Sequence, residues 1–182
     1  MVWNEKLKQE IPKGWNNCIL EYFLTIKNGR GHKHLAAGLY PVYGSGGEIC
    51  RGNENLYRGE TVLMLRKGTL NNVMYVGEAF GTVDTMFYSE MKLTHCSKYI
   101  FFAIKDIDFT EWDSGTSVPT MTASTLYNIS TIKPNEDLLK RFNEVTTSVF
   151  HKIKQIKVEC EELTKQRDEL LLLLMNEQIT IE

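Results

Sequence analysis

The amino-acid sequence predicts an α+β domain of short strands and short helices, followed by a long C-terminal coiled-coil helix. Through residues 1–134, short apolar segments alternate with turns rich in Gly, Asn and Ser, which is typical of one small mixed domain. From residue 135 to residue 182 the chain holds no Gly or Pro, and apolar residues recur every three or four positions, which is typical of a long helix. A length of 182 residues suits one globular domain with an appendage. We therefore expect two parts, residues 1–134 and residues 135–182.

The elements expected in the first part are short. Residues 1–12 form a polar arm, and the three- to four-residue spacing of aromatic and aliphatic side chains over 15–26 predicts a short helix. Strands are expected where β-branched and aromatic residues lie between turn residues, at 39–43, 61–65, 73–76, 85–88 and 127–132. A helix at 98–104 and a single helical turn at 122–126 complete the domain.

Residues 138–174 carry an apolar seam with the spacing of a coiled coil. Its steps are three or four positions, with one extra four-residue step between Val149 and Ile153 and with Arg167 at one seam position. Pro134 stops the preceding segment, and Asn135 is a candidate cap for the helix. The seam residues expected to contact a partner helix are Phe142, Val149, Ile153, Ile156, Leu163, Leu170 and Leu174.

The predicted helix needs a partner of similar length. About forty helical residues make a rod about 60 Å long, because each residue rises about 1.5 Å. Residues 1–134 offer no such helix, since Gly and turn residues interrupt them at short intervals. The partner is therefore expected to be another chain, and a second copy of this one is the simplest candidate.

The charge balance excludes a protein that binds nucleic acid through overall positive charge. The chain has 21 basic and 23 acidic residues, a formal net charge of −2. Within 27–67, however, seven Lys and Arg residues outnumber three Glu, with His32 and His34 nearby. This segment is either a local anion-binding surface or an ordinary mixed surface, and charge alone favours the second interpretation.

The cysteines and the apolar runs indicate the cellular location. Cys18, Cys50, Cys96 and Cys160 are far apart and show no C-x-x-C spacing, which favours reduced structural residues over a metal site or a disulfide framework. The N-terminus is polar, and the apolar run 170–175 is too short to span a bilayer. We expect a cytoplasmic protein with no membrane contact.

The sequence lacks the motifs of common enzymes. There is no G-x-S-x-G elbow and no H-E-x-x-H or zinc-deaminase pattern. The glycines at 44–47 lack the spacing of a phosphate loop or a dinucleotide fingerprint. His32 and His34 have no evident third ligand. We therefore expect no catalytic residue, no metal and no cofactor in this chain.

Polar loop tips at 43–47, 66–72 and 114–120 are the candidate binding residues. Their Arg, Lys, Asn, Ser and Thr side chains can bond phosphate oxygens and base edges, and Gly permits close backbone approach. Turns use the same residue types for conformational reasons alone. On composition, a nucleic-acid interface and plain turns are equally well supported.

Several segments, taken in order, resemble a known family. The segments are 11–15 (IPKGW), 40–47 (YPVYGSGG), 65–69 (LRKGT) with 72–73 (NV), 83–88 (VDTMFY) and 114–119 (SGTSVP). In this order they resemble the target-recognition domain of type I restriction-modification specificity subunits. Residues 166–175 (QRDELLLLLM) resemble the end of that family's C-terminal conserved helix. The resemblance covers nearly the whole chain.

The resemblance implies a function that the chain performs with partners. Members of the family have two recognition domains joined by two long antiparallel helices, so this chain, with one of each, looks like a half subunit. Two copies would pair their helices antiparallel and read a bipartite, interrupted inverted repeat in double-stranded DNA. By the same resemblance, the helices dock methyltransferase subunits and, through them, an ATP-dependent restriction subunit. Methylation and cleavage would belong to those partners.

On this hypothesis the loop residues take specific roles. Four cations are assigned to phosphate or guanine contacts: Lys27, Arg30, Arg66 and Lys67. Hydrogen bonds in a groove or to the backbone are assigned to Tyr43, Ser45, Thr69, Asn71, Ser114, Thr116 and Thr120. The alternative is a coiled-coil adaptor for protein partners without DNA specificity. A stand-alone small-molecule enzyme is a third interpretation, which a co-purifying cofactor would support.

Overall fold

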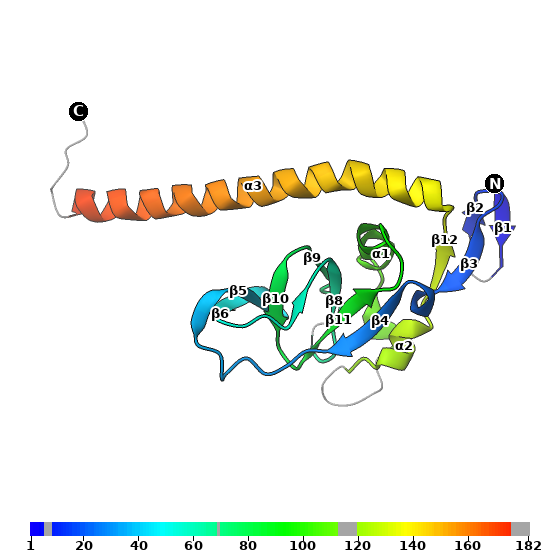
Figure 1. The fold of residues 1–182 in the computed structure, drawn as a ribbon, viewed down its shortest axis with the longest axis horizontal. Helices are drawn as coiled ribbons and strands as arrows, with labels where there is room; N and C mark the ends of the chain where they lie inside the picture. The colour runs from blue at the N-terminus through cyan, green and yellow to red at the C-terminus, as the bar shows by residue number, and fades with distance from the viewer. Residues whose placement is uncertain (6–8, 69, 113–119, 176–182) are drawn as a thin grey trace. The chain divides into compact units, whose positions relative to one another are not determined.

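The computed structural model describes residues 1–5, 9–68, 70–112 and 120–175, with the side chains of 9, 111 and 112 left aside (Figure 1). The chain divides into two compact units, residues 1–143 and residues 144–182. The first unit holds mixed strands and short helices, and a long helix runs to the end of the described chain. This confirms the α+β fold with a long C-terminal helix.

Two antiparallel pairs form the first part of the domain. Strands β1 (Val2–Asn4) and β2 (Gln9–Ile11) pair with each other, and β3 (Asn16–Ile19) pairs with β12 (Ser130–Lys133). The second pair joins the start of the chain to the segment that precedes the long helix.

Two four-stranded sheets form the centre of the domain. One is antiparallel with strand order β4-β11-β8-β9, made of β4 (Leu24–Asn28), β11 (Met86–Met91), β8 (Thr61–Leu65) and β9 (Met74–Val76). The other has the order β6-β5-β10-β7, made of β6 (Gly47–Gly52), β5 (Ala37–Gly44), β10 (Ala79–Thr82) and β7 (Tyr57–Arg58). Strands β5 and β10 are parallel, and the other neighbours in this sheet are antiparallel.

The core lies around β8, whose five residues are all buried. A strand buried on both faces is continuously apolar rather than alternating, as residues 62–65 (VLML) are, and the hydroxyl of the buried Thr61 donates to the carbonyl of Ser89 at 2.7 Å. Helix α1 (Ser97–Ile104) packs on β8 and β9 and buries Ile100 and Ile104. Aromatic rings of the second sheet and β11 meet edge to face, with the centroids of Phe80 and Tyr88 6.1 Å apart.

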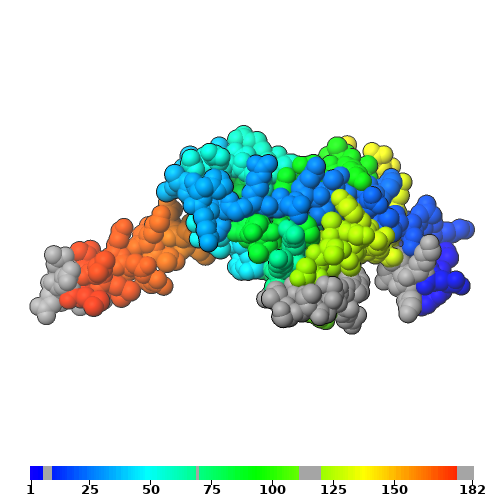
Figure 2. Space-filling view, turned by 90° about the horizontal axis from the view of Figure 1, so that it is seen from below, coloured from blue at the N-terminus to red at the C-terminus, as the bar shows by residue number. Residues whose placement is uncertain are grey.

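Three short helices complete the domain. They are the 3-10 turns η1 (Leu20–Tyr22) and η2 (Phe109–Trp112) and the helix α2 (Ala123–Tyr127). The backbone N–H of Ile26 in β4 donates to the Tyr127 hydroxyl at the end of α2, at 2.8 Å. Figure 2 shows the corresponding side of the molecule, where the blue β4 region lies beside the yellow-green α2.

The prediction of a helix over residues 15–26 is wrong. This segment forms β3, η1 and β4, and the polar arm predicted over 1–12 contains the strands β1 and β2. Long-range pairing of β3 with β12 and of β4 with β11 outweighs the local spacing that favoured a helix. Leu20, Phe23 and Leu24 are buried in the core, so the apolar pattern marked burial rather than a helical face.

The other expected elements are confirmed with small shifts. Strands β5, β8, β9 and β11 overlap the predicted strands, and α1 and α2 overlap the predicted helices. The last predicted strand begins later, at Ser130, because residues up to Tyr127 belong to α2. Strands β6, β7 and β10 were not predicted.

The long helix α3 (Glu136–Met175) begins within the domain. The Asn135 side-chain oxygen accepts the N–H of Leu138 at 2.8 Å, which confirms the predicted cap, and Glu136 and Asp137 occupy the first turn. Leu139 is buried, and the Phe142 ring lies 5.9 Å from the Phe102 ring of α1. The first two turns of α3 are therefore part of the domain's packing.

From residue 144 to residue 175 most of the helix is exposed, with Thr146, Phe150, Leu173 and Leu174 half-buried. The seam side chains of Val149, Ile153, Ile156 and Leu163 are 53, 56, 47 and 56 % exposed in the single chain. Lys157 and Glu161, one turn apart, form an ion pair at 3.9 Å on the polar side. Of the described helices, none is both long and apolar enough to cross a membrane.

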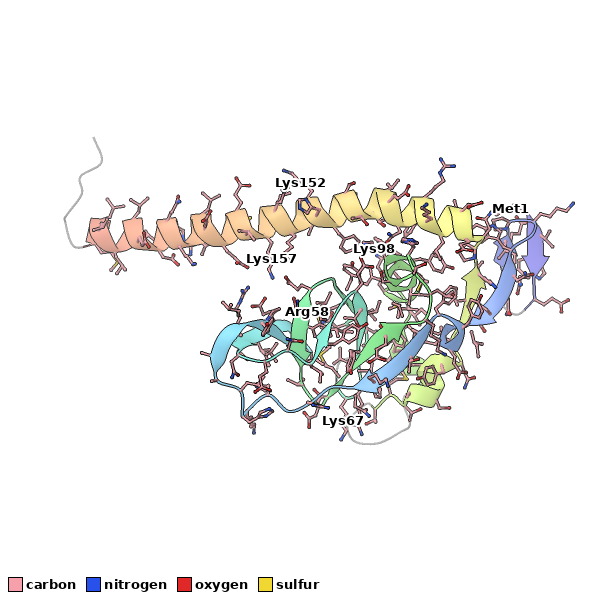
Figure 3. All side chains as sticks on the ribbon, viewed as in Figure 1. Met1, Arg58, Lys67, Lys98, Lys152 and Lys157 are labelled. Carbon is pink, nitrogen blue, oxygen red and sulfur yellow. The ribbon has the colours of Figure 1, made fainter. Side chains whose placement is uncertain are left out.

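An ion pair between the buried Lys98 of α1 and the exposed Glu60 connects α1 to its surroundings (Figure 3). The Lys98 ammonium is buried and lies 2.7 Å from a carboxylate oxygen of Glu60 and 3.1 Å from the side-chain oxygen of Asn143. The hydroxyl of Ser97 also bonds Glu60. Burial raises the pKa of Glu60, but hydrogen bonds from Lys98 and Ser97 outweigh burial and hold that pKa below its usual value. The Glu60 carboxylate is therefore kept charged beside the buried ammonium.

We predict that Glu60→Ala lowers the free energy of unfolding by about 2–3 kcal/mol at pH 7, because it leaves the buried Lys98 charge without its anion. Urea unfolding followed by circular dichroism measures the change. The double variant Glu60→Leu with Lys98→Met removes both charges, so its free energy of unfolding should fall by less than that of Glu60→Ala. Equal losses in the two variants would mean that the ion pair is not the source of the effect.

The contribution of Glu60 should depend on pH in a defined direction. A carboxylate whose pKa is lowered by folding stabilises the protein above its unfolded pKa, about 4.3, and this stabilisation is lost as the pH falls through the folded value. The difference in unfolding free energy between the wild type and Glu60→Ala should therefore shrink below about pH 4. A difference that grows on acidification would contradict the assignment.

Candidate nucleic-acid interface

The predicted polar loops meet at one edge of the domain. The side-chain amide of Asn72 donates to the backbone carbonyl of Ser45, which joins the turn between β5 and β6 to the connection between β8 and β9. Lys67 and Thr120 form an antiparallel bridge, and the N–H of Met121 donates to the carbonyl of Arg66 at 2.9 Å. Segments 43–47, 66–72 and the end of 114–120, far apart in sequence, therefore lie together.

Arg66 and Lys67 provide the positive charge at this edge. Their N–H groups both donate to the carbonyl of Thr85, at 2.9 and 3.2 Å, which fixes the backbone from which the side chains extend. The Arg66 guanidinium lies 6.0 Å from the centroid of the Phe87 ring, a distance typical of a cation–π contact. Lys67 is exposed and forms no ion pair with a described residue. Figure 3 shows Lys67 at the lower edge of the domain and Arg58 apart from it, higher in the view.

Lys27 and Arg30 do not lie at the edge formed by Arg66 and Lys67. Lys27 pairs in register with Tyr88 and lies 3.8 Å from Glu90, on the same face of β11 as Tyr88. Neighbouring residues of a strand point to opposite faces, so Lys27 is on the other face of the sheet from Phe87. Burial and then the charge of Glu90 raise the pKa of Tyr88, and the nearby charge of Arg30 opposes them. The four predicted cations therefore form two groups.

The second group borders a shallow hollow. Its volume is about 60 Å³, and it is lined by Arg30, His32 and His34 together with Glu54, Leu56 and Thr82. The basic excess over 27–67 is thus divided in space, with one part beside this hollow and the other at the edge of Arg66 and Lys67.

Two residues predicted to bond DNA are used within the domain. The Asn71 side chain donates to Asp108 at 2.9 Å and accepts the N–H of Phe109 at 2.8 Å, so it holds the segment of η2. The Tyr43 ring packs 6.3 Å from Phe80, and burial is the main cause that raises the pKa of Tyr43 to about 12. The structure thus uses the exposed Asn71 for hydrogen bonds within the domain and places the half-buried Tyr43 in its packing.

The remaining predicted site residues divide into two sets. Ser45 is exposed at the turn, and Thr120 is half-buried at the bridge to Lys67. Thr69, Ser114 and Thr116 lie outside the described residues. Asn72 joins two of the loops but was not among the site residues predicted from the sequence. Its position beside Asn71 in a polar connection was the sequence signal that could have identified it.

The comparisons with known proteins identify the fold. No family model and no curated protein matches the sequence. Among solved structures, the type I restriction-modification S subunit from M. genitalium matches with a TM-score of 0.70 and 14 % identity, over 91 % of this chain and 47 % of that one.

Two further solved structures give the same result. One, described as showing complex assembly and conformational transition of the type I R-M system, matches at a TM-score of 0.56 and 13 % identity, over 89 % of this chain and 45 % of that one. The HsdS subunit from Thermoanaerobacter tengcongensis matches with a TM-score of 0.54 and 12 % identity, over 82 % of this chain and 40 % of that one. The chain therefore has the fold of type I specificity subunits and spans about half their length, as the sequence resemblance predicted.

We predict that Asn71→Ala lowers the free energy of unfolding by about 1–3 kcal/mol, because it leaves the N–H of Phe109 without its acceptor. Urea unfolding measures the loss. Lys67→Ala, at an exposed position nearby, is the control and should change stability by less than about 0.5 kcal/mol. An unaffected Asn71→Ala variant would show that its side chain does not support the edge.

Proposed function

We propose that this chain is a sequence-specific DNA recognition subunit of a type I restriction-modification system. The observation that carries the proposal is the gathering of three polar loops at one edge, with Arg66 and Lys67 among them, on a fold shared with specificity subunits. Arg and Lys side chains contact phosphates and guanine, and Ser, Thr and Asn bond the backbone and base edges. The edge thus combines positioning and reading groups.

The chain itself is proposed to be non-catalytic. Within the described parts of the chain, no cluster of three His, Cys, Asp or Glu side chains could hold a metal ion. Adenine methylation would be performed by methyltransferase subunits and cleavage by an ATP-dependent restriction subunit. This assignment rests on the fold and on one matched structure, which concerns complex assembly of the type I R-M system.

Pairing of two copies completes the proposed reader. One chain carries one recognition domain and a helix whose apolar seam is about half exposed. A two-fold pair of such helices would carry one domain at each end, so that two identical domains read two halves of an interrupted inverted repeat. Rod length would then set the unread spacer.

The direct test is methylome sequencing of a host that expresses this chain together with its methyltransferase subunit. We expect adenine methylation at an interrupted palindromic consensus that is absent when the chain is omitted. Methylation without a consensus that depends on this chain would favour the coiled-coil adaptor, which would account for the exposed seam without DNA reading.

The edge cations give a quantitative prediction. Lys67→Ala, measured as part of the complex with the methyltransferase, should reduce the slope of log affinity against log salt by about one, because one phosphate contact releases about one counterion. Arg66→Ala should act in the same way if its guanidinium meets phosphate. Arg58→Ala, at a position apart from Lys67, is the matched control and should leave the slope unchanged (Figure 3). A slope that responds to Arg58 and not to Lys67 would place the DNA elsewhere.

The seam gives a second prediction. Leu163→Asp should turn a dimer into a monomer in light scattering, since burying a Leu contributes about 1.5–3 kcal/mol and an unpaired buried carboxylate costs more. Val158→Asp is the control, because Val158 is equally exposed in the single chain but lies off the seam. A Leu163→Asp protein that stays dimeric would exclude this seam as the interface.

A further inference from the structure

The seam of α3 is nearly symmetric about one residue. Counting outward from Val158, Ile156 and Cys160 stand two positions away, Ile153 and Leu163 five positions, and Val149 and Arg167 nine. The symmetry holds from Val149 to Arg167 and not beyond, because Leu170, twelve positions away, has Thr146 as its counterpart and Phe142 packs on α1. Over this central part, the helix can face a reversed copy of itself with each of these seam positions opposed.

The charges around Val158 have opposite signs on its two sides. Lys152, Lys154 and Lys157 precede it, and the acidic residues Glu159, Glu161 and Glu162 follow it. In a reversed pair the basic run of each helix lies alongside the acidic run of the other. Paired helices lie about 8–10 Å apart, within the Debye length of about 8–10 Å, so these runs attract. A parallel pair in register would place like charges together.

We propose that the second copy binds antiparallel with its two-fold axis level with Val158, so that Ile156 of one helix faces Cys160 of the other. This inference rests on the pairing proposed above and specifies its register. It has a geometric consequence for Asn143, the last residue of the compact domain. The two copies of this residue lie about 45 Å apart along the paired helices, at a rise of about 1.5 Å per residue.

The register determines which thiols can meet. Cys160 is exposed in the single chain. In the proposed pair the two Cys160 residues are offset by four positions, about 6 Å along the axis, in addition to the separation of the helices. A disulfide requires a Cα separation of about 4.4–6.8 Å, so two Cys160 residues do not bridge, whereas positions 156 and 160 of opposite chains are level and can.

The experiment uses mild oxidation of the full chain, read on a non-reducing gel, in a background carrying Cys50→Ser, since Cys50 is the other exposed cysteine. Ile156→Cys, which retains Cys160, should give a covalent dimer as the main species. The background alone and Ile156→Cys with Cys160→Ser should remain monomeric on the gel. Sedimentation of each variant under reducing conditions reports whether it is a dimer before oxidation.

The outcomes separate register from pairing. Cross-linking of the background alone, or of Ile156→Cys with Cys160→Ser, would indicate parallel helices or a different antiparallel register, and either would overturn the proposal. A dimer in sedimentation that no variant cross-links would overturn the register and leave the pairing intact. A monomer in sedimentation would overturn both, and methylome sequencing would still report separately on DNA reading.

Discussion

The exposed apolar side of α3 is the constraint on which the rest of the structure depends. Between Val149 and Leu170 the seam side chains are about half exposed, and apolar surface left in water costs about 25 cal/mol for each Å². An isolated helix in water is also marginal, because helices in proteins are stabilised chiefly by packing one face. A covering surface would stabilise this side of the helix, and in the pair proposed above a reversed copy supplies one that matches in apolar spacing and in charge.

The domain supplies a firm base for both the helix and the loops. Leu139 and Phe142 pack within the domain, and Asn143 bonds the buried Lys98, so α3 begins from packed residues. At another edge, backbone and side-chain bonds of Arg66, Lys67 and Asn72 join three connections that are distant in sequence. Binding residues on loops that a rigid scaffold holds together are a common arrangement for recognition.

The sequence predicted the elements whose signals are local. The cap at Asn135, the uninterrupted helix after it and the apolar strand β8 all follow from short-range residue patterns. The prediction of a helix over 15–26 failed because the strands that pair with this segment, β12 and β11, lie more than sixty residues away. Local spacing carries no information about them. Leu139, not its neighbour Leu138 in the predicted seam, is the buried residue of the first turn.

The candidate site was predictable by residue type and not by position. Gly, Ser, Asn and basic residues identified the loops, but the separation of Lys27 and Arg30 from Arg66 and Lys67 follows from strand order, which the sequence does not show. The internal bonds of Asn71 likewise depend on where η2 lies.

Sedimentation equilibrium of the full chain tests the central claim most directly. The account predicts a mass twice the 21.0 kDa of one chain, with dissociation only on dilution. A single species of 21.0 kDa at every concentration would contradict it.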